Sequence, residues 1–256
     1  MTSANQINEV LSRLRGAPAA TFEAYTRSLR QGGVLPATKR GRGAKPMTAE
    51  DAGMILLAVM RGANTKAAEN AAELGALIAA EDSLDSFGNE SIFSAKLQTL
   101  DWEDGITLKQ AIGRVIGTFA DAQEHELFAT TSTLRLEVDR YFPAAALTFT
   151  PHPDKTSAYL EAWKAALPDA KQVWPWASLA GVLHNPIRLS FKHPSRHAIR
   201  TSFEAGETEE NRSAHDAWHA LIRQRTAFDL HGTEAITAST IGGLASLFRK
   251  TKGTGD

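Results

Sequence analysis

Residues 38–45 form a short segment that is rich in cations and in glycine. Lys39, Arg40, Arg42 and Lys45 lie within eight positions that also hold two glycines. Glycine lets a backbone approach a ligand closely, and clustered basic side chains neutralise phosphate groups. The segment therefore predicts a loop that contacts a polyanion.

Two histidines offer a second kind of chemistry. His215 and His219 stand four residues apart in the sequence HDAWH, and this spacing puts both on one face of a helix, where they could share a metal ion. The zinc-protease pattern has a glutamate directly after the first histidine, whereas Asp216 stands here, and no third ligand follows at the expected spacing. A metal-dependent hydrolase using this pair stays an alternative, but we assign no metal site.

Other catalytic patterns are missing from the sequence. The chain has no cysteine, which excludes disulfides, zinc–cysteine sites and thiol catalysis. It also has no G-x-S-x-G elbow, no Walker-type phosphate loop and no dinucleotide-binding glycine pattern after a strand. We therefore expect no cofactor and no catalytic residue, with the role of residues 131–256 left open.

Helices on both sides must position the basic loop. An apolar stripe that stops at Gly16 predicts a first helix. A second helix is predicted over 19–31, ended by Gly32-Gly33, and Thr48 with Asp51 predicts the capped start of a third. The expected buried positions of the three helices are Ile7, Val10, Leu11, Leu14, Phe22, Tyr25, Leu29, Ala52, Ile55, Leu56 and Val59.

Two short helices joined by a few residues, followed by a basic loop, predict a winged helix-turn-helix. The exposed face of the second helix would carry Thr26, Arg27 and Arg30, which we expect to enter the major groove of DNA, where arginine suits guanine. The loop would act as a wing. Its expected contacts with the DNA backbone are Lys39, Arg40, Arg42 and Lys45.

The stretch RSLRQGGVLPATKRGRGAKPMTAEDAGMILLAV resembles the winged helix-turn-helix of MerR-type regulators. In that family the second helix ends in a glycine, and two apolar residues, a basic wing and an acidic-capped helix follow. The resemblance covers about 60 residues and implies DNA binding. Pro46-Met47 replace the family's aromatic residue, and no heptad-bearing helix ends the chain. Phage small terminase subunits and excisionases carry a similar winged head, so a DNA-packaging or recombination accessory protein is an alternative.

The rest of the chain changes character near residue 130. Helices are predicted over 65–80, over 94–100 and from Thr107 to about Leu127. Beyond them, alternating apolar residues predict strands over 133–142, 144–149, 187–191 and 197–203, with a weaker candidate at 227–230. Further helices are predicted over 157–166, 213–224 and 240–249. The expected fold is α+β, with a DNA-binding head (1–62), a helical connector or oligomerisation region (63–130) and an α+β body (131–256).

Charge along the chain is uneven. Residues 1–66 hold ten basic against four acidic side chains, and residues 67–130 hold three against twelve. A basic head favours an anionic partner. The sequence predicts no signal peptide and no membrane span, so we expect a cytoplasmic transcriptional regulator that binds double-stranded DNA. We also expect a homo-oligomer, since one head covers only a few base pairs, and a protein partner for the body is possible. Another anionic or protein partner for the head, or no binding role, are the remaining alternatives.

Overall fold

The computed structural model describes residues 2–37, 46–62, 64–79, 105–121, 132–140, 142–151, 187–194, 212–213, 216, 220 and 233–249. The helices in these ranges are α1 Ala4–Arg15, α2 Ala19–Gln31, α3 Ala49–Arg61, the 3-10 turn η1 Asn64–Lys66, α4 Ala67–Gly75, α7 Leu108–Phe119 and α13 Ala238–Ser246. The strands are β1 Ile78–Ala79, β2 Ser132–Asp139, β3 Ala144–Pro151, β4 Ile187–Lys192 and β5 Thr233–Thr237.

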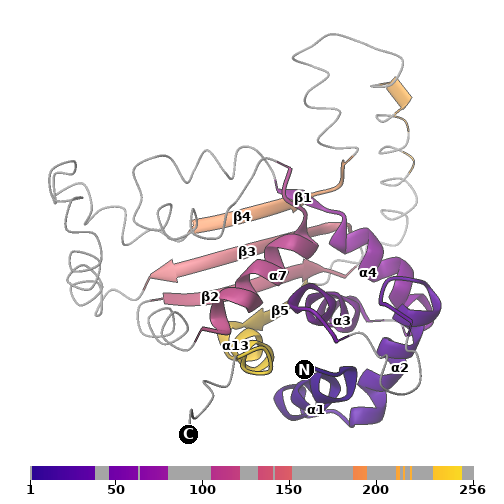
Figure 1. The fold of residues 1–256 in the computed structure, drawn as a ribbon. Coiled ribbons are helices and arrows are strands. Elements are labelled where there is room, and N and C mark those ends of the chain that lie inside the picture. The colour runs from indigo at the N-terminus through magenta and orange to yellow at the C-terminus, as the bar shows by residue number, and fades with distance from the viewer. Residues whose placement is uncertain are drawn as a thin grey trace, which may run out of the picture.

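The strands form one antiparallel sheet in the order β1-β4-β3-β2-β5 (Figure 1). Leu136 on β2 lies opposite Leu147 on β3 and Ile236 on β5, so apolar residues of neighbouring strands share one face. The strands predicted over 133–142, 144–149 and 187–191 are confirmed. Strands β1 and β5 were not predicted, and the strands and helices predicted over 94–100, 157–166, 197–203 and 227–230 lie outside the described residues.

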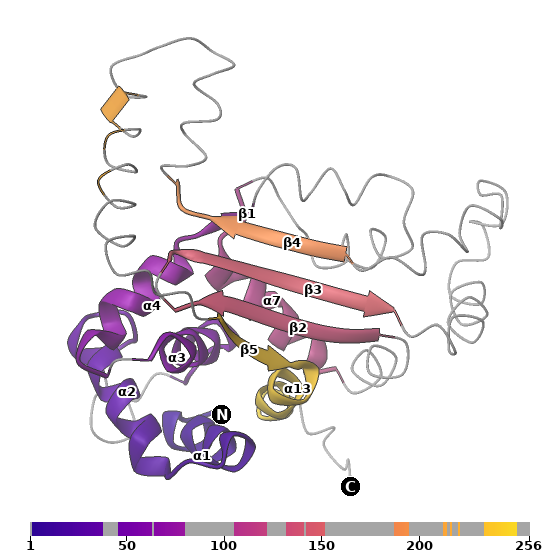
Figure 2. The same cartoon turned by 180° about the vertical axis from the view of Figure 1, so that it is seen from behind.

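Helices cover the apolar face of the sheet. Leu134, Leu136 and Val138 of β2 are fully buried, and α3 and α13 both contact β2 and β5. Figures 1 and 2 show α7, α3 and α13 on this same side of the strands. The α+β class is therefore confirmed, as helices packed on one face of an antiparallel sheet.

Side-chain caps begin three of these helices. Thr48 accepts a hydrogen bond from the backbone of Asp51 at 3.1 Å, and the Asp51 carboxylate accepts one from the Thr48 backbone at 2.8 Å. Thr107 with Gln110 and Ser3 with Gln6 form the same reciprocal box. Each box satisfies backbone donors that a helix start leaves free, so the predicted starts at Thr48 and Thr107 are confirmed.

Helix α3 lies at the centre of the molecule. Every residue from Ala52 to Ala58 is buried, and the helix contacts α2, α4, α7, β2 and β5. Glycines allow its close approach to α7: a β-carbon at Gly53 would lie 2.9 Å from Ile112. One cluster of buried side chains takes members from every α-helix and every strand of the described chain. The cluster has members on both sides of residues 62 and 130, and the division into a head, a connector and a body stays a prediction.

Two local expectations were wrong. The helix predicted over 65–80 ends at Gly75, because the chain turns there to place Ile78 and Ala79 in β1 against β4. Leu14, expected in the core, is 40% exposed, since it lies at the edge of α1 above Gly243 of α13.

Candidate nucleic-acid interface

Helices α1 and α2 form the outer layer of the candidate interface. The turn between them spans only three residues, and Gly16 takes a left-handed conformation (φ 65°) that ends α1. α1 packs against α13, and α2 packs against α3 and α4 (Figures 1 and 2). Within the described part of the chain, the pair is thus held on its inner side by α13, α3 and α4.

Thr26 does not lie on the exposed face that the sequence predicted. It follows Phe22 by four residues and precedes Leu29 by three, so it falls inside the buried stripe of α2 and is 3% exposed. Its hydroxyl donates a hydrogen bond of 2.9 Å to the Asn8 side chain on α1. A buried hydroxyl needs such an acceptor, so Thr26 joins α1 to α2 and its side chain does not face solvent.

Arg27 and Arg30 differ in their surroundings. Arg27 is exposed, whereas Arg30 is half-buried, and the Nε of Arg30 is buried without a hydrogen-bond partner. Within the described chain neither guanidinium forms an ion pair or a hydrogen bond. Both cations are therefore available to an external anion.

The segment that follows α2 has fixed ends. Gly33 takes the left-handed conformation (φ 73°), and the Val34 and Gly33 backbones donate hydrogen bonds to Leu29 and Arg30, which closes the helix in a Schellman motif. Leu35 is then buried. On the far side of the loop, the backbone of Met47 donates a hydrogen bond of 3.0 Å to Thr2.

The basic loop itself lies between these two anchors. Lys39, Arg40, Arg42 and Lys45 lie outside the described residues, so their predicted contacts with DNA stay a prediction. The described chain is buried on both sides of the loop, at Leu35 after α2 and at Met47 directly before α3.

Most unpaired basic side chains of the described residues belong to the N-terminal part of the chain. Several described cations form ion pairs with carboxylates, namely Arg15, Arg61, Lys109, Arg135 and Arg140. Others have neither an ion pair nor a hydrogen bond among the described residues, namely Arg13, Arg27, Arg30, Lys66 and Arg249. All but Arg249 belong to the first 66 residues. The sequence analysis did not single out Arg13 and Lys66.

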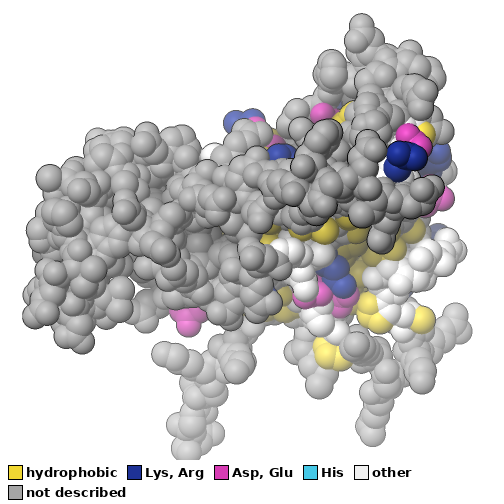
Figure 3. All heavy atoms as spheres, turned by 90° about the horizontal axis from the view of Figure 1, so that it is seen from above, with side chains coloured by type: hydrophobic (Ala, Val, Ile, Leu, Met, Phe, Trp, Pro, Cys, Tyr) yellow, Lys and Arg dark blue, Asp and Glu magenta, His cyan; other side chains and the backbone are white. Residues whose placement is uncertain are grey.

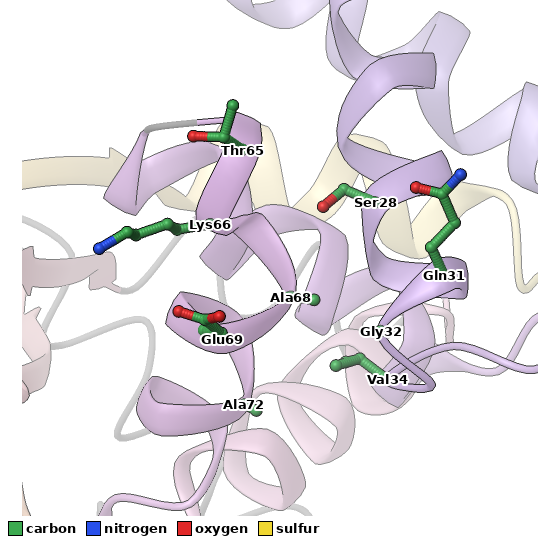
Figure 4. A pocket seen from close by; sticks show the side chains of 9 residues that line it. All are labelled: Ser28, Gln31, Gly32, Val34, Thr65, Lys66, Ala68, Glu69 and Ala72. Atoms are coloured by element: carbon green, nitrogen blue, oxygen red, sulfur yellow. The ribbon is translucent and has the colours of Figure 1, made fainter.

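An open groove of about 430 Å³ lies between α2 and α4. Figure 4 shows Ser28 and Val34 directed toward this groove, and the side chain of Gln31, which also lines it, extends along α2. The helices meet closely beneath it, since a β-carbon at Gly32 would lie 2.3 Å from that of Ala68. Gln31 was missed by sequence analysis, although its position four residues after Arg27 places both on the same face.

Ionic contacts hold α1 to the sheet. The Glu234 carboxylate on β5 pairs with Arg15 of α1 and, at 2.7 Å, with Arg140 after β2. Burial by itself would raise the pKa of Glu234, but the hydrogen bonds from both arginines outweigh burial and lower that pKa. Burial raises the pKa of Tyr25 on α2, and the charge of Arg140 opposes this. Glu234 thus fixes α1 to β5 and links it to Arg140 at the end of β2.

The metal alternative receives no support from the described residues, which contain no cluster of three or more histidine or acidic side chains placed to hold a metal. His215 and His219 lie outside them. Figure 3 looks onto the side of the molecule remote from α1. There the coloured basic and acidic side chains lie next to one another, so the described surface of that face is mixed in charge.

Comparison of the chain with protein-family models, with curated proteins and with solved structures finds no match. The resemblance of residues 27–59 to MerR-type regulators therefore stays a prediction. In the part of the chain that the structure describes, no helix is both long enough and apolar enough to cross a bilayer.

Proposed function

We propose that this chain binds duplex DNA, with α2 in the major groove and the basic loop of residues 38–45 against the phosphate backbone. The unpaired cations of α2, Arg27 and Arg30, carry the proposal. Five other described cations, Arg15, Arg61, Lys109, Arg135 and Arg140, pair with carboxylates, whereas Arg27 and Arg30 have no such partner. Unpaired cations beside a loop with four more favour a polyanionic partner.

The geometry of α2 suits a groove. The helix lies on the outside of the molecule, its inner side is fixed by α1, α3 and α4, and its outer side carries Arg27. The major groove of B-DNA is wide enough for one helix, and arginine donates two hydrogen bonds to guanine. Burial of Thr26 reduces the predicted groove contacts to Arg27 and Arg30.

The role that we propose is transcriptional regulation. One helix reaches only a few base pairs, so useful specificity requires a dimer with two half-sites about one helical turn apart. Light scattering of the complex tests this point. A dimer on a two-fold symmetric site supports a regulator, whereas a larger ring on repeated sites supports the DNA-packaging alternative.

The deciding experiment is a salt titration of duplex binding by the full-length chain and by the double variant Arg40→Ala/Arg42→Ala. Each phosphate contact contributes about 0.9 to the slope of log affinity against log salt, so the variant should lose about 1.8 from that slope. The affinity ratio of wild type to variant then falls about 12-fold between about 50 and about 200 mM salt. An unchanged slope would defeat the role of the loop, and no binding by the wild type would defeat DNA binding.

A further inference from the structure

Buried contacts fix which side of α2 faces outward. Phe22, Tyr25, Thr26 and Leu29 are buried, and Thr26 is hydrogen-bonded to α1, so α2 cannot rotate about its axis without breaking these contacts. The positions of α2 that are exposed are Ala20, Glu23, Arg27 and Gln31. They follow the spacing of one helical face.

Gln31 is a firmly held position on this face. It is the last residue of α2, and the hydrogen bond of 2.9 Å from Val34 to Leu29 closes the helix around it. The next residue, Gly32, packs directly on Ala68. The Gln31 amide forms no hydrogen bond among the described residues, and its side chain extends along α2 at the edge of the groove (Figure 4). A rigid backbone with a free amide is what contact with a base edge requires.

Glu23 indicates which half of the face approaches DNA. Its carboxylate lies one turn before Arg27 and would be repelled by phosphates. The C-terminal half of α2, which carries Arg27 and Gln31 and leads into the basic loop, has no such charge on its exposed positions. The half-buried Arg30 lies beside them and adds its positive charge to this half of the helix.

We propose that Arg27 and Gln31 determine base preference, with Arg27 selecting guanine and Gln31 selecting adenine about two base-pair steps away. Arginine pairs with guanine and glutamine with adenine through two hydrogen bonds each in the major groove. Four residues along a helix span about 6 Å, close to two base-pair steps of about 3.4 Å. This inference rests on the proposed DNA-binding function.

Selection of bound sequences from a random duplex library by the full-length chain tests the assignment. The wild type should enrich a guanine and an adenine at this separation. Arg27→Ala should lose the guanine preference alone, and Gln31→Ala the adenine preference alone, each by about 5- to 150-fold. Gln31→Glu should change the preferred base from adenine to cytosine, since a carboxylate accepts from the cytosine amino group. A role in stability alone would not produce that change.

Arg13→Ala is the matched control, because it removes one exposed, unpaired cation from α1 and should leave the selected motif unchanged. If Gln31→Ala and Gln31→Glu select the wild-type motif, the inference is wrong. If the wild type retains DNA without base preference while Arg40→Ala/Arg42→Ala still flattens the salt dependence, the inference fails and the proposed function stands. If no DNA is retained, both fail.

Discussion

The contact between α2 and α4 provides a sharp test of how the outer helix is held. Gly32 has φ −81°, so an alanine there meets no backbone strain. Its β-carbon would nevertheless lie 2.3 Å from the Ala68 β-carbon. Carbon atoms in contact are normally about 3.5–4.0 Å apart, and a methyl group on the backbone cannot rotate away. In Gly32→Ala the two helices must therefore separate by more than about 1 Å.

The cost of that separation follows from overpacking. An extra carbon forced into a packed contact destabilises a protein by about 1–3 kcal/mol. For a chain of this size we expect a melting temperature about 3–9 °C lower, at about 3 °C per kcal/mol. Thermal and urea unfolding of the full-length chain, followed by circular dichroism, measures the change. Gly117→Ala on α7 is the control: no heavy atom of the described residues lies within 4 Å of its β-carbon, and alanine there should stabilise by up to about 1 kcal/mol.

A second substitution tests the cause. Ala68→Gly alone should cost about 0.5–1 kcal/mol through lower helix propensity. Combined with Gly32→Ala it removes the clashing methyl group, so the double variant should be more stable than the sum of the single effects predicts, by about 1–3 kcal/mol. If Gly32→Ala melts with the wild type, or if the two effects add, α2 does not lie against α4 as described.

Two further substitutions test the attachment of the outer helices. Thr26→Val should lower the free energy of urea unfolding by about 1–3 kcal/mol, because the Asn8 side chain loses its buried donor. The DNA affinity of the folded variant should not change, and a loss of affinity would restore Thr26 as a DNA contact. The second substitution is Glu234→Gln. In the wild type, the two arginines lower the folded-state pKa of Glu234 below its ordinary value of 4.5. The stability that the Glu234 carboxylate contributes is therefore present above that value and is lost as the pH falls through the folded-state pKa. The difference in unfolding free energy between wild type and Glu234→Gln should thus be constant near about pH 7 and should vanish at strongly acid pH. A difference that does not depend on pH would contradict the role of the two arginines.

The sequence predicted those helices and strands that depend on contacts between residues close together in the chain. The start of α3 at Thr48, the end of α2 at the glycine pair and the alternation in β2 all follow from interactions within a few residues. The burial of most of the apolar stripe of α2 followed from periodicity. Even the strand β3 could be predicted, because it follows β2 after a short turn and pairs with it directly.

Long-range contacts could not be predicted in this way. The spacing of α2 places Thr26 in the buried stripe, but the acceptor that its hydroxyl needs there is Asn8, 18 residues earlier on another helix. β5 is placed by pairing with β2, about 95 residues earlier, and its sequence TEAIT has only one large apolar residue to indicate a strand. The two-residue β1 is similarly fixed by Phe191 and Lys192 of β4. A prediction from periodicity considers one short stretch of sequence at a time, so it cannot identify such distant partners.

Long-range contacts also decide whether a fragment of residues 1–62 can fold and bind DNA by itself. They contain every residue that we propose to contact DNA, but α3 is buried on sides that face α4, α7 and the sheet. A fragment of 1–62 would expose the apolar residues between Ala52 and Ala58, and it would also lose the tie from Arg15 to Glu234. We expect no cooperative thermal transition in the fragment and a large loss of DNA affinity. Cooperative melting near the temperature of the full-length chain would show that the shared core is not required, and the binding unit would then be separable from the sheet.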